Sequence, residues 1–277
     1  MNGLPNPPAR VLGVSALVLF AIAFAYVEAA VVVYLRAIYT PIRAAVHPGQ
    51  PAGELFPVLT LDQLRRSGEG QEGRLRIELG REFATLVMLA AAAATYARGV
   101  GDWFGRFMIA FGVWDIFFYV WLKVCIDWPA SIWQWDILFL LPVLWAGPVL
   151  APVIVSISMI VAGGIILWRE RSGVCYRPAW WSWTGMMAGA LVMIVAFCRD
   201  WRHLSAGGSP RGFPWWLFGL GEVLGAAAFF AGLPRGGGRA GRGSLRALGG
   251  CRSDDHAAVG ASSGEGRVEA ERRPSHE

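Results

Sequence analysis

The fold is decided by residues 104–124, which read FGRFMIAFGVWDIFFYVWLKV. This stretch is apolar and has about the length that a helix needs to cross a bilayer. Asp115, Tyr119 and Lys123 follow one another at four-residue steps within it, so a helix places all three on one face. Asp115 falls near mid-membrane, where a carboxylate has to face protein or water. We therefore expect a membrane helix with one polar face and a pocket beside that face.

The continuation, residues 127–152, reads DWPASIWQWDILFLLPVLWAGPVLAP and is also apolar. Its prolines exclude one straight helix. We predict a short helix over residues 131–141, which contains Asp136 and is ended by Pro142. A helix of that length reaches only about 16 Å, half a bilayer, so it is either re-entrant or interfacial. In the interfacial case the neighbouring tryptophans would anchor it at the membrane surface.

The composition places the whole chain in a membrane. Of 277 residues, 55% are hydrophobic and only 16% are charged, and the chain carries 14 Trp and 15 Phe. That is too apolar for a soluble domain of this size. The net charge of +5 comes largely from arginines beside the apolar segments and in the C-terminal tail, where anionic headgroups are the ordinary partner. The lipid bilayer is thus the expected partner, and nucleic acid is not.

The apolar segments predict an all-α, polytopic bundle over residues 1–233 with about six spans and the short helix. After it, residues 234–277 form a Gly/Arg-rich tail that has almost no large apolar side chain and is expected to be disordered. The predicted spans are residues 11–35, 82–98, 104–124, 147–168, 179–197 and 215–233.

Two features outside the central stretch add polar groups to the bundle. Glu28 lies about 10 Å inside the end of the first span, where an unpaired charge is costly. After a long polar loop that is expected to begin at Arg36, the residues at 78, 81, 82 and 85 (Glu, Arg, Glu and Thr) form a stripe into the second span. This stripe is either a solvated first turn with Glu/Arg pairs or one wall of a site at headgroup level.

Small residues predict close helix contacts in the last two spans. Gly185 and Gly189 are four apart in the fifth span, and Gly221 and Gly225 repeat the spacing in the sixth, beside Glu222. Such spacing allows two helices to approach closely, although it does not identify the partner helix.

Cysteine and histidine patterns indicate no cofactor. The four cysteines form no metal-type spacing, and the four histidines fall in predicted loops or in the tail. We therefore expect no metal site, no other cofactor and no disulfide framework.

The words WDIFFYVWLK, DWP and WDILFLLPVLWAGPVLAP resemble an uncharacterised family of bacterial multi-pass membrane proteins. The resemblance extends from Glu28 to about the fourth span. It implies a multi-span domain in a bacterial inner membrane, and it implies no activity. The positive charges flanking the spans are equally numerous on both sides; discounting the long first loop places both termini in the cytoplasm.

Two classes of function remain open. In the first, Glu28, Asp115 and Glu222 line a polar cavity that binds a cation, a proton or a small polar molecule, as in a transporter-like protein or a scaffold. Within this class we expect Glu28 and Asp115 to share one cavity, with Tyr119 and Lys123 on the same wall and the 131–141 helix as its lid.

In the second class the protein is an intramembrane enzyme acting on lipid headgroups. Asp115 or Asp136 would be the general base, and Tyr119 or Lys123 the electrophile. A third possibility is that the buried charges only pair with one another and hold the helices together. Enzymes usually need several polar groups that converge at one depth, whereas these acids are expected to be spread along the bundle, so binding or scaffolding is favoured over catalysis.

Overall fold

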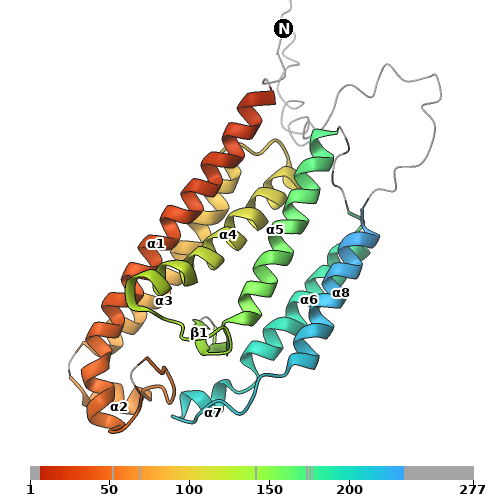
Figure 1. The fold of residues 1–277 in the computed structure, drawn as a ribbon. Coiled ribbons are helices and arrows are strands. Elements are labelled where there is room, and N and C mark those ends of the chain that lie inside the picture. The colour runs from red at the N-terminus through yellow and green to blue at the C-terminus, as the bar shows by residue number, and fades with distance from the viewer. Residues whose placement is uncertain are drawn as a thin grey trace, which may run out of the picture.

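Long helices dominate the computed structural model, which describes residues 7–51, 53–68, 70–140, 142–172, 174, 176 and 178–233. They are arranged as an elongated bundle (Figure 1). Its elements in chain order are α1 (Pro7–Val46), α2 (Leu61–Arg66), α3 (Gln71–Ala94), α4 (Val100–Ile126), β1 (Trp135–Phe139), β2 (Trp145–Pro148), α5 (Leu150–Arg171), α6 (Trp180–Cys198), α7 (Trp201–Ser205) and α8 (Trp215–Ala231). The predicted tail, residues 234–277, lies outside the described residues.

Four stretches are long and apolar enough to cross a membrane, namely residues 13–46, 100–126, 150–171 and 180–205. They are consistent with the predicted helical membrane protein and with contact to a lipid bilayer. The two remaining long helices depart from this pattern for different reasons. The first half of α3 is charged, and α8 is apolar but has only 17 residues.

Helix α4 is the centre of the bundle and packs against both α1 and α5. Glycine permits the α4–α5 approach at two levels. A Cβ atom on Gly112 would lie 2.5 Å from the Ser156 carbonyl oxygen, and one on Gly163 would lie 2.5 Å from the Gly105 carbonyl oxygen. Both distances are far inside van der Waals contact, so the two backbones touch. This contact fixes the side chains of α4 relative to those of α5.

The glycines of α6 and α8 meet each other. These helices run side by side (Figure 1), and a Cβ atom on Gly189 would lie 2.6 Å from the Gly225 nitrogen. A Cβ atom on Gly221 would lie 2.8 Å from the Gly189 carbonyl oxygen. The predicted close contact is therefore present: Gly189 lies against both Gly221 and Gly225, and Gly185 lies against Ala228.

The predicted helix over residues 131–141 is wrong, because its middle, Trp135–Phe139, forms the first strand of a β-hairpin. Strand β1 pairs antiparallel with β2, with Trp135 opposite Pro148 and Asp136 opposite Gly147. A short run rich in Trp, Ile and Phe suits a strand better than a helix, and the partner strand satisfies its backbone groups.

The neighbouring tryptophans are not all surface anchors. Trp135 packs edge-on to Phe56 with ring centroids 6.3 Å apart, and Trp145 stacks on Phe197 at 6.4 Å. Trp128 is buried, whereas Trp133 is exposed. These rings hold the hairpin against the loop after α1 and the end of α6, which explains its fixed position.

The expected start of the first loop at Arg36 is also wrong, because α1 continues to Val46. Its 40 residues extend about 60 Å, twice the hydrocarbon thickness of a bilayer. The helix is therefore longer than one crossing needs, and its last turns, which carry Arg36 and Arg43, are the part expected to project beyond the hydrocarbon layer. Arg36, Thr40 and Arg43 occupy positions i, i+4 and i+7 there, so they share one face of the helix.

Candidate functional site

A cavity of about 1020 Å³ lies at the end of the bundle that carries α2, α7 and the hairpin. In Figure 1 this is the end opposite the label N. Its walls come from α1, α3, α4, the start of α5 and strand β1, with α2 and the end of α7 at the rim. The polar and charged lining residues are Glu28, Arg36, Tyr39, Thr40, Arg43, Thr60, Asp62, Arg65, Glu78, Arg81, Glu82, Thr85, Asp115, Tyr119, Asp136, Ser156 and Ser205.

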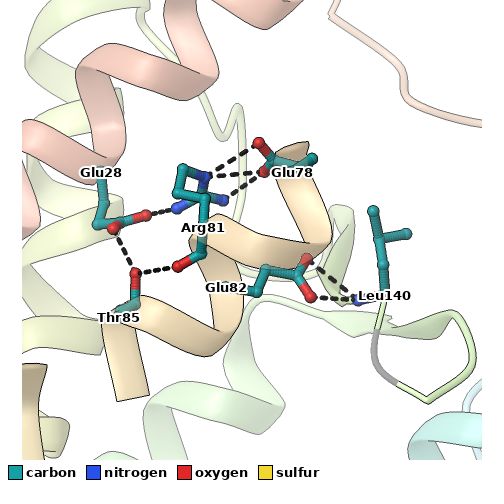
Figure 2. Close-up of polar contacts among 6 residues, drawn as sticks. All are labelled: Glu28, Glu78, Arg81, Glu82, Thr85 and Leu140. Carbon is teal, nitrogen blue, oxygen red and sulfur yellow. Dashed lines mark hydrogen bonds and ion pairs between the residues drawn. The ribbon is translucent and has the colours of Figure 1, made fainter. Parts of the chain in front are cut away.

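Arg81 joins α1 to α3 in the cavity wall (Figure 2). Its guanidinium group forms ion pairs with Glu28 on α1 and with Glu78 one turn earlier on α3. The Thr85 hydroxyl donates a hydrogen bond to Glu28 Oε1 at 2.5 Å. Glu28 is only 4% exposed, so its charge is held by Arg81 and Thr85 rather than by water.

Glu82 connects α3 to the hairpin. The Leu140 backbone N–H, just after β1, donates to both carboxylate oxygens of Glu82, at 2.9 and 3.1 Å (Figure 2). The Glu82 side chain is buried. A carboxylate acceptor makes this hydrogen bond stronger than a neutral one. The hairpin is thus attached to the helix wall by its backbone, at the place where a lid had been expected.

Asp115 lies where α4 touches α5. Its Oδ2 accepts a hydrogen bond from the Ser156 hydroxyl at 2.8 Å, and Asp115 is 9% exposed. Within the described part of the chain, no arginine, lysine or histidine nitrogen lies within 4.0 Å of its carboxylate oxygens. The Gly112–Ser156 approach sets this geometry, since it brings Ser156 to the α4 surface one turn before Asp115.

Asp136 of strand β1 adds a further carboxylate to the cavity lining. The Tyr119 hydroxyl donates to Asp136 Oδ2 at 3.1 Å, and the Arg36 guanidinium interacts electrostatically with the same carboxylate. Burial raises the pKa of Asp136 to about 6, and Arg36 and Tyr119 oppose that rise. Arg36 in turn stacks over the Trp128 ring, with 3.9 Å from its Cζ to the ring centroid.

Four of the six predicted site residues share this cavity: Glu28, Asp115, Tyr119 and Asp136. The expected common cavity of Glu28 and Asp115 is therefore present. The expectation that the acids are spread along the bundle is therefore wrong for Glu28, Asp115 and Asp136, which line one cavity, and holds only for Glu222. Aromatic walls surround them, contributed by Phe111, Trp114 and Phe118 of α4, Phe139 of β1 and Trp145 of β2.

Lys123 and Glu222 lie elsewhere. Lys123 is half-exposed, pairs with Asp127 at 2.6 Å and donates to the Pro129 carbonyl at 3.1 Å, so it is not on the cavity wall as predicted. Lys123 lies two helical turns after Asp115, which carries it past the cavity to the surface of the protein. Glu222 of α8 is outside the lining and interacts with Ser158 of α5.

The predicted stripe on α3, residues 78, 81, 82 and 85, combines the two alternatives. Glu78 and Arg81 form an ion pair within one turn, and all four residues line the cavity. Sequence reasoning missed Ser156, Arg36 and Arg43. Ser156 is one hydroxyl in an apolar helix and gives no signal of its own. The two arginines are seven residues apart, and that spacing would have been informative if α1 had been extended beyond Leu35.

Comparisons with protein families, with characterised proteins and with solved structures find no match to this chain. Among the described residues, no group of three or more His, Cys, Asp or Glu side chains is placed to hold a metal ion. The arrangement consists of buried carboxylates, hydroxyl donors and aromatic rings around a space of ligand size. Such a site can bind a positive group between acids and ring faces, and it can take up or release protons.

Proposed function

We propose that the protein is a six-span membrane protein whose cavity binds a small polar molecule with a positively charged group. The observation that supports it most is Asp115, a buried carboxylate in the cavity whose hydrogen-bond donor is a neutral hydroxyl. A desolvated carboxylate is costly unless it is protonated or compensated by a cation. Glu28 has Arg81 for this purpose, and Asp136 has Arg36 nearby. A ligand cation or a proton compensates Asp115.

The walls and the volume favour an organic cation over a bare ion. About 1020 Å³ is at the upper end of the range for sites that enclose small organic ligands. Trp114 and Phe118 lie on the same helix as Asp115 and line the same space. Aromatic faces attract alkylated ammonium groups, and they add to the attraction of a carboxylate when water is excluded.

Native mass spectrometry of the protein in a mild detergent tests this proposal. The wild type is expected to retain a small molecule that is lost in Asp115→Asn, which keeps the shape and the Ser156 contact while removing the charge. Lys123→Met is the control, because it removes a cation of the same helix that lies outside the cavity. Equal retention in all three proteins, or none in the wild type, would contradict the proposal.

The six-span arrangement has its own test in reporter fusions after Arg106, Trp145, Arg177 and Pro234. Six spans place the first, third and fourth fusions on the side of the N-terminus and the fusion after Trp145 on the opposite side. With cytoplasmic termini, the cavity opens away from the cytoplasm. Fusions after Trp145 and Arg177 that report the same side would show that α5 does not cross.

One observation supports the alternative of an intramembrane enzyme acting on lipid headgroups. Asp115, Tyr119 and Asp136 line one cavity, and Tyr119 and Asp136 are hydrogen-bonded to each other. A general base and a hydroxyl group at one depth are what such chemistry needs. Incubation of the protein with a defined phospholipid, followed by mass spectrometry for headgroup loss, separates this alternative from binding alone.

A further inference from the structure

The α1 wall of the cavity carries two arginines whose environment differs from that of Arg81. Arg36 and Arg43 share one face of α1 and both line the cavity. The Nε atoms of both side chains are buried and have no hydrogen-bond partner. A buried donor without a partner is rare in proteins, because it loses its hydrogen bonds to water and gains none. Two such donors in the lining of one cavity indicate a group that the protein alone does not supply.

Charge leads to the same conclusion. Arg36 and Arg43 repel each other electrostatically. Arg43 donates to the Glu54 backbone carbonyl oxygen, which carries no formal charge. Arg36 has Asp136 in electrostatic range, but its ring contact with Trp128 is with a neutral side chain. An anion between the two guanidinium groups would relieve their repulsion and accept hydrogen bonds from both.

The depth of the pair in the bundle defines the kind of anion. Arg36 lies two helical turns, about 12 Å, beyond Glu28, on the part of α1 that extends past the hydrocarbon layer. This is the level of lipid phosphates, which arginine binds well because its planar fork matches their oxygens. Asp136 interacts with both Arg36 and Asp115, so a positive and a negative region of the lining lie close together.

We infer that Arg36 and Arg43 form an anion subsite for the phosphate of a zwitterionic ligand, whose ammonium group extends inward to Asp115. This inference rests on the proposed binding of a cationic group and adds the second charge of the ligand. The phosphate belongs either to a membrane lipid or to a free phosphodiester with the same headgroup. The two sources share this chemistry and differ in whether acyl chains accompany the headgroup.

Isothermal titration of the purified full-length protein with choline, glycerophosphocholine and inorganic phosphate separates the two charges. Glycerophosphocholine is expected to bind at least about tenfold more tightly than choline. Arg43→Gln should remove that advantage without weakening choline binding, because it takes a positive charge out of the lining, whereas Asp115→Asn should weaken the binding of both ligands. Arg211→Gln is the control, since Arg211 is an exposed arginine at the same end of the bundle and outside the lining. It is expected to bind like the wild type.

The source of the phosphate is read from a parallel measurement. Native mass spectrometry in micelles with added phosphatidylcholine is expected to show a retained lipid only if acyl chains contribute, and Arg36→Gln and Arg43→Gln should lose it. Binding of the soluble ester alone identifies a free ligand.

The outcomes distinguish the inference from the function on which it rests. Choline binding without any gain from phosphate, in either ester or lipid, overturns the subsite and leaves the proposed function standing. If Arg43→Gln weakens the binding of choline as much as the binding of glycerophosphocholine, the subsite is also overturned, because Arg43 would then support the cavity as a whole. Failure of every probe in the wild type overturns the subsite and counts against the proposed function as well.

Discussion

Removal of the Arg81 guanidinium should destabilise the protein because it leaves two carboxylates without their cation. Glu28 is 5% and Arg81 24% exposed at the side chain. Breaking a buried ion pair by deleting one partner costs about 3–5 kcal/mol. Since Arg81 retains some contact with water, we expect Arg81→Met to lower the free energy of unfolding by about 3 kcal/mol, at the lower end of that range.

Substitution of Glu28, the ion-pair partner of Arg81, should lower the free energy of unfolding by less. Glu28→Gln keeps the shape and can still accept the hydrogen bond of Thr85, while Arg81 keeps Glu78. We expect a loss of about 1 kcal/mol. The double variant lacks both the cation and the Glu28 charge, so it should be more stable than the sum of the single losses predicts. We expect the double variant to lose about 2 kcal/mol, whereas the two single losses add up to about 4 kcal/mol; the difference is a coupling free energy of about 2 kcal/mol.

Reversible unfolding in mixed micelles, followed through tryptophan fluorescence, measures all four proteins of this cycle. Lys123→Met serves as the exposed ion-pair control and should unfold like the wild type. If the two substitutions are additive within about 0.5 kcal/mol, the ion pair between Glu28 and Arg81 does not contribute as described.

Three further predictions concern separate parts of the chain. Burial raises the pKa of Asp136 to about 6, so protonation of this carboxyl favours the folded state. The unfolding free energy of the wild type relative to that of Asp136→Asn should therefore fall by about 2–3 kcal/mol as the pH rises from 4 to 7. A difference that does not change with pH would refute this. Gly189→Val should separate α6 from α8 and lower the thermal stability, whereas Gly219→Val, where a Cβ atom meets nothing within 4 Å, should not; equal effects would contradict the contact. Truncation after Pro234 should leave expression and thermal stability unchanged, because the removed sequence has almost nothing to bury, and a large loss of either would refute that.

Residues with a helical period were predictable because the periodicity is local. Asp115 and Tyr119 were expected on one face and lie on one cavity wall, and the glycine pairs of α6 and α8 were expected to pack closely and do so. Lys123 satisfies the same period but lies too near the end of the helix to reach the cavity. The depth of a residue along a helix is therefore as important as the face it occupies.

The hairpin and the arginine pair depend on contacts that a sequence window does not contain. Strand β1 is stabilised by pairing with β2 and by the Phe56 ring against Trp135, while β2 is held by the Phe197 ring against Trp145. Arg36 appeared to mark the end of a span, because charge usually ends an apolar segment. In the structure the helix continues, and the charge is tolerated where it faces the cavity and the Trp128 ring. Tertiary contacts thus override the local signal at both places.

Thiol accessibility distinguishes most directly between a hydrated cavity in the bundle and a closed set of paired charges. Val155 and Ile157 lie two residues apart on α5, and only Val155 lines the cavity, while Ile157 is 51% exposed on the outer surface. Each is replaced by cysteine in a protein whose Cys125, Cys175, Cys198 and Cys251 are changed to serine.

With both variants in sealed proteoliposomes, a membrane-impermeant, positively charged thiol reagent should modify Val155→Cys from the side of the hairpin and leave Ile157→Cys, which faces lipid, unmodified. Prior addition of glycerophosphocholine should slow the modification. Protection of Val155→Cys from the reagent on both sides of the membrane would contradict the cavity and the binding function built on it.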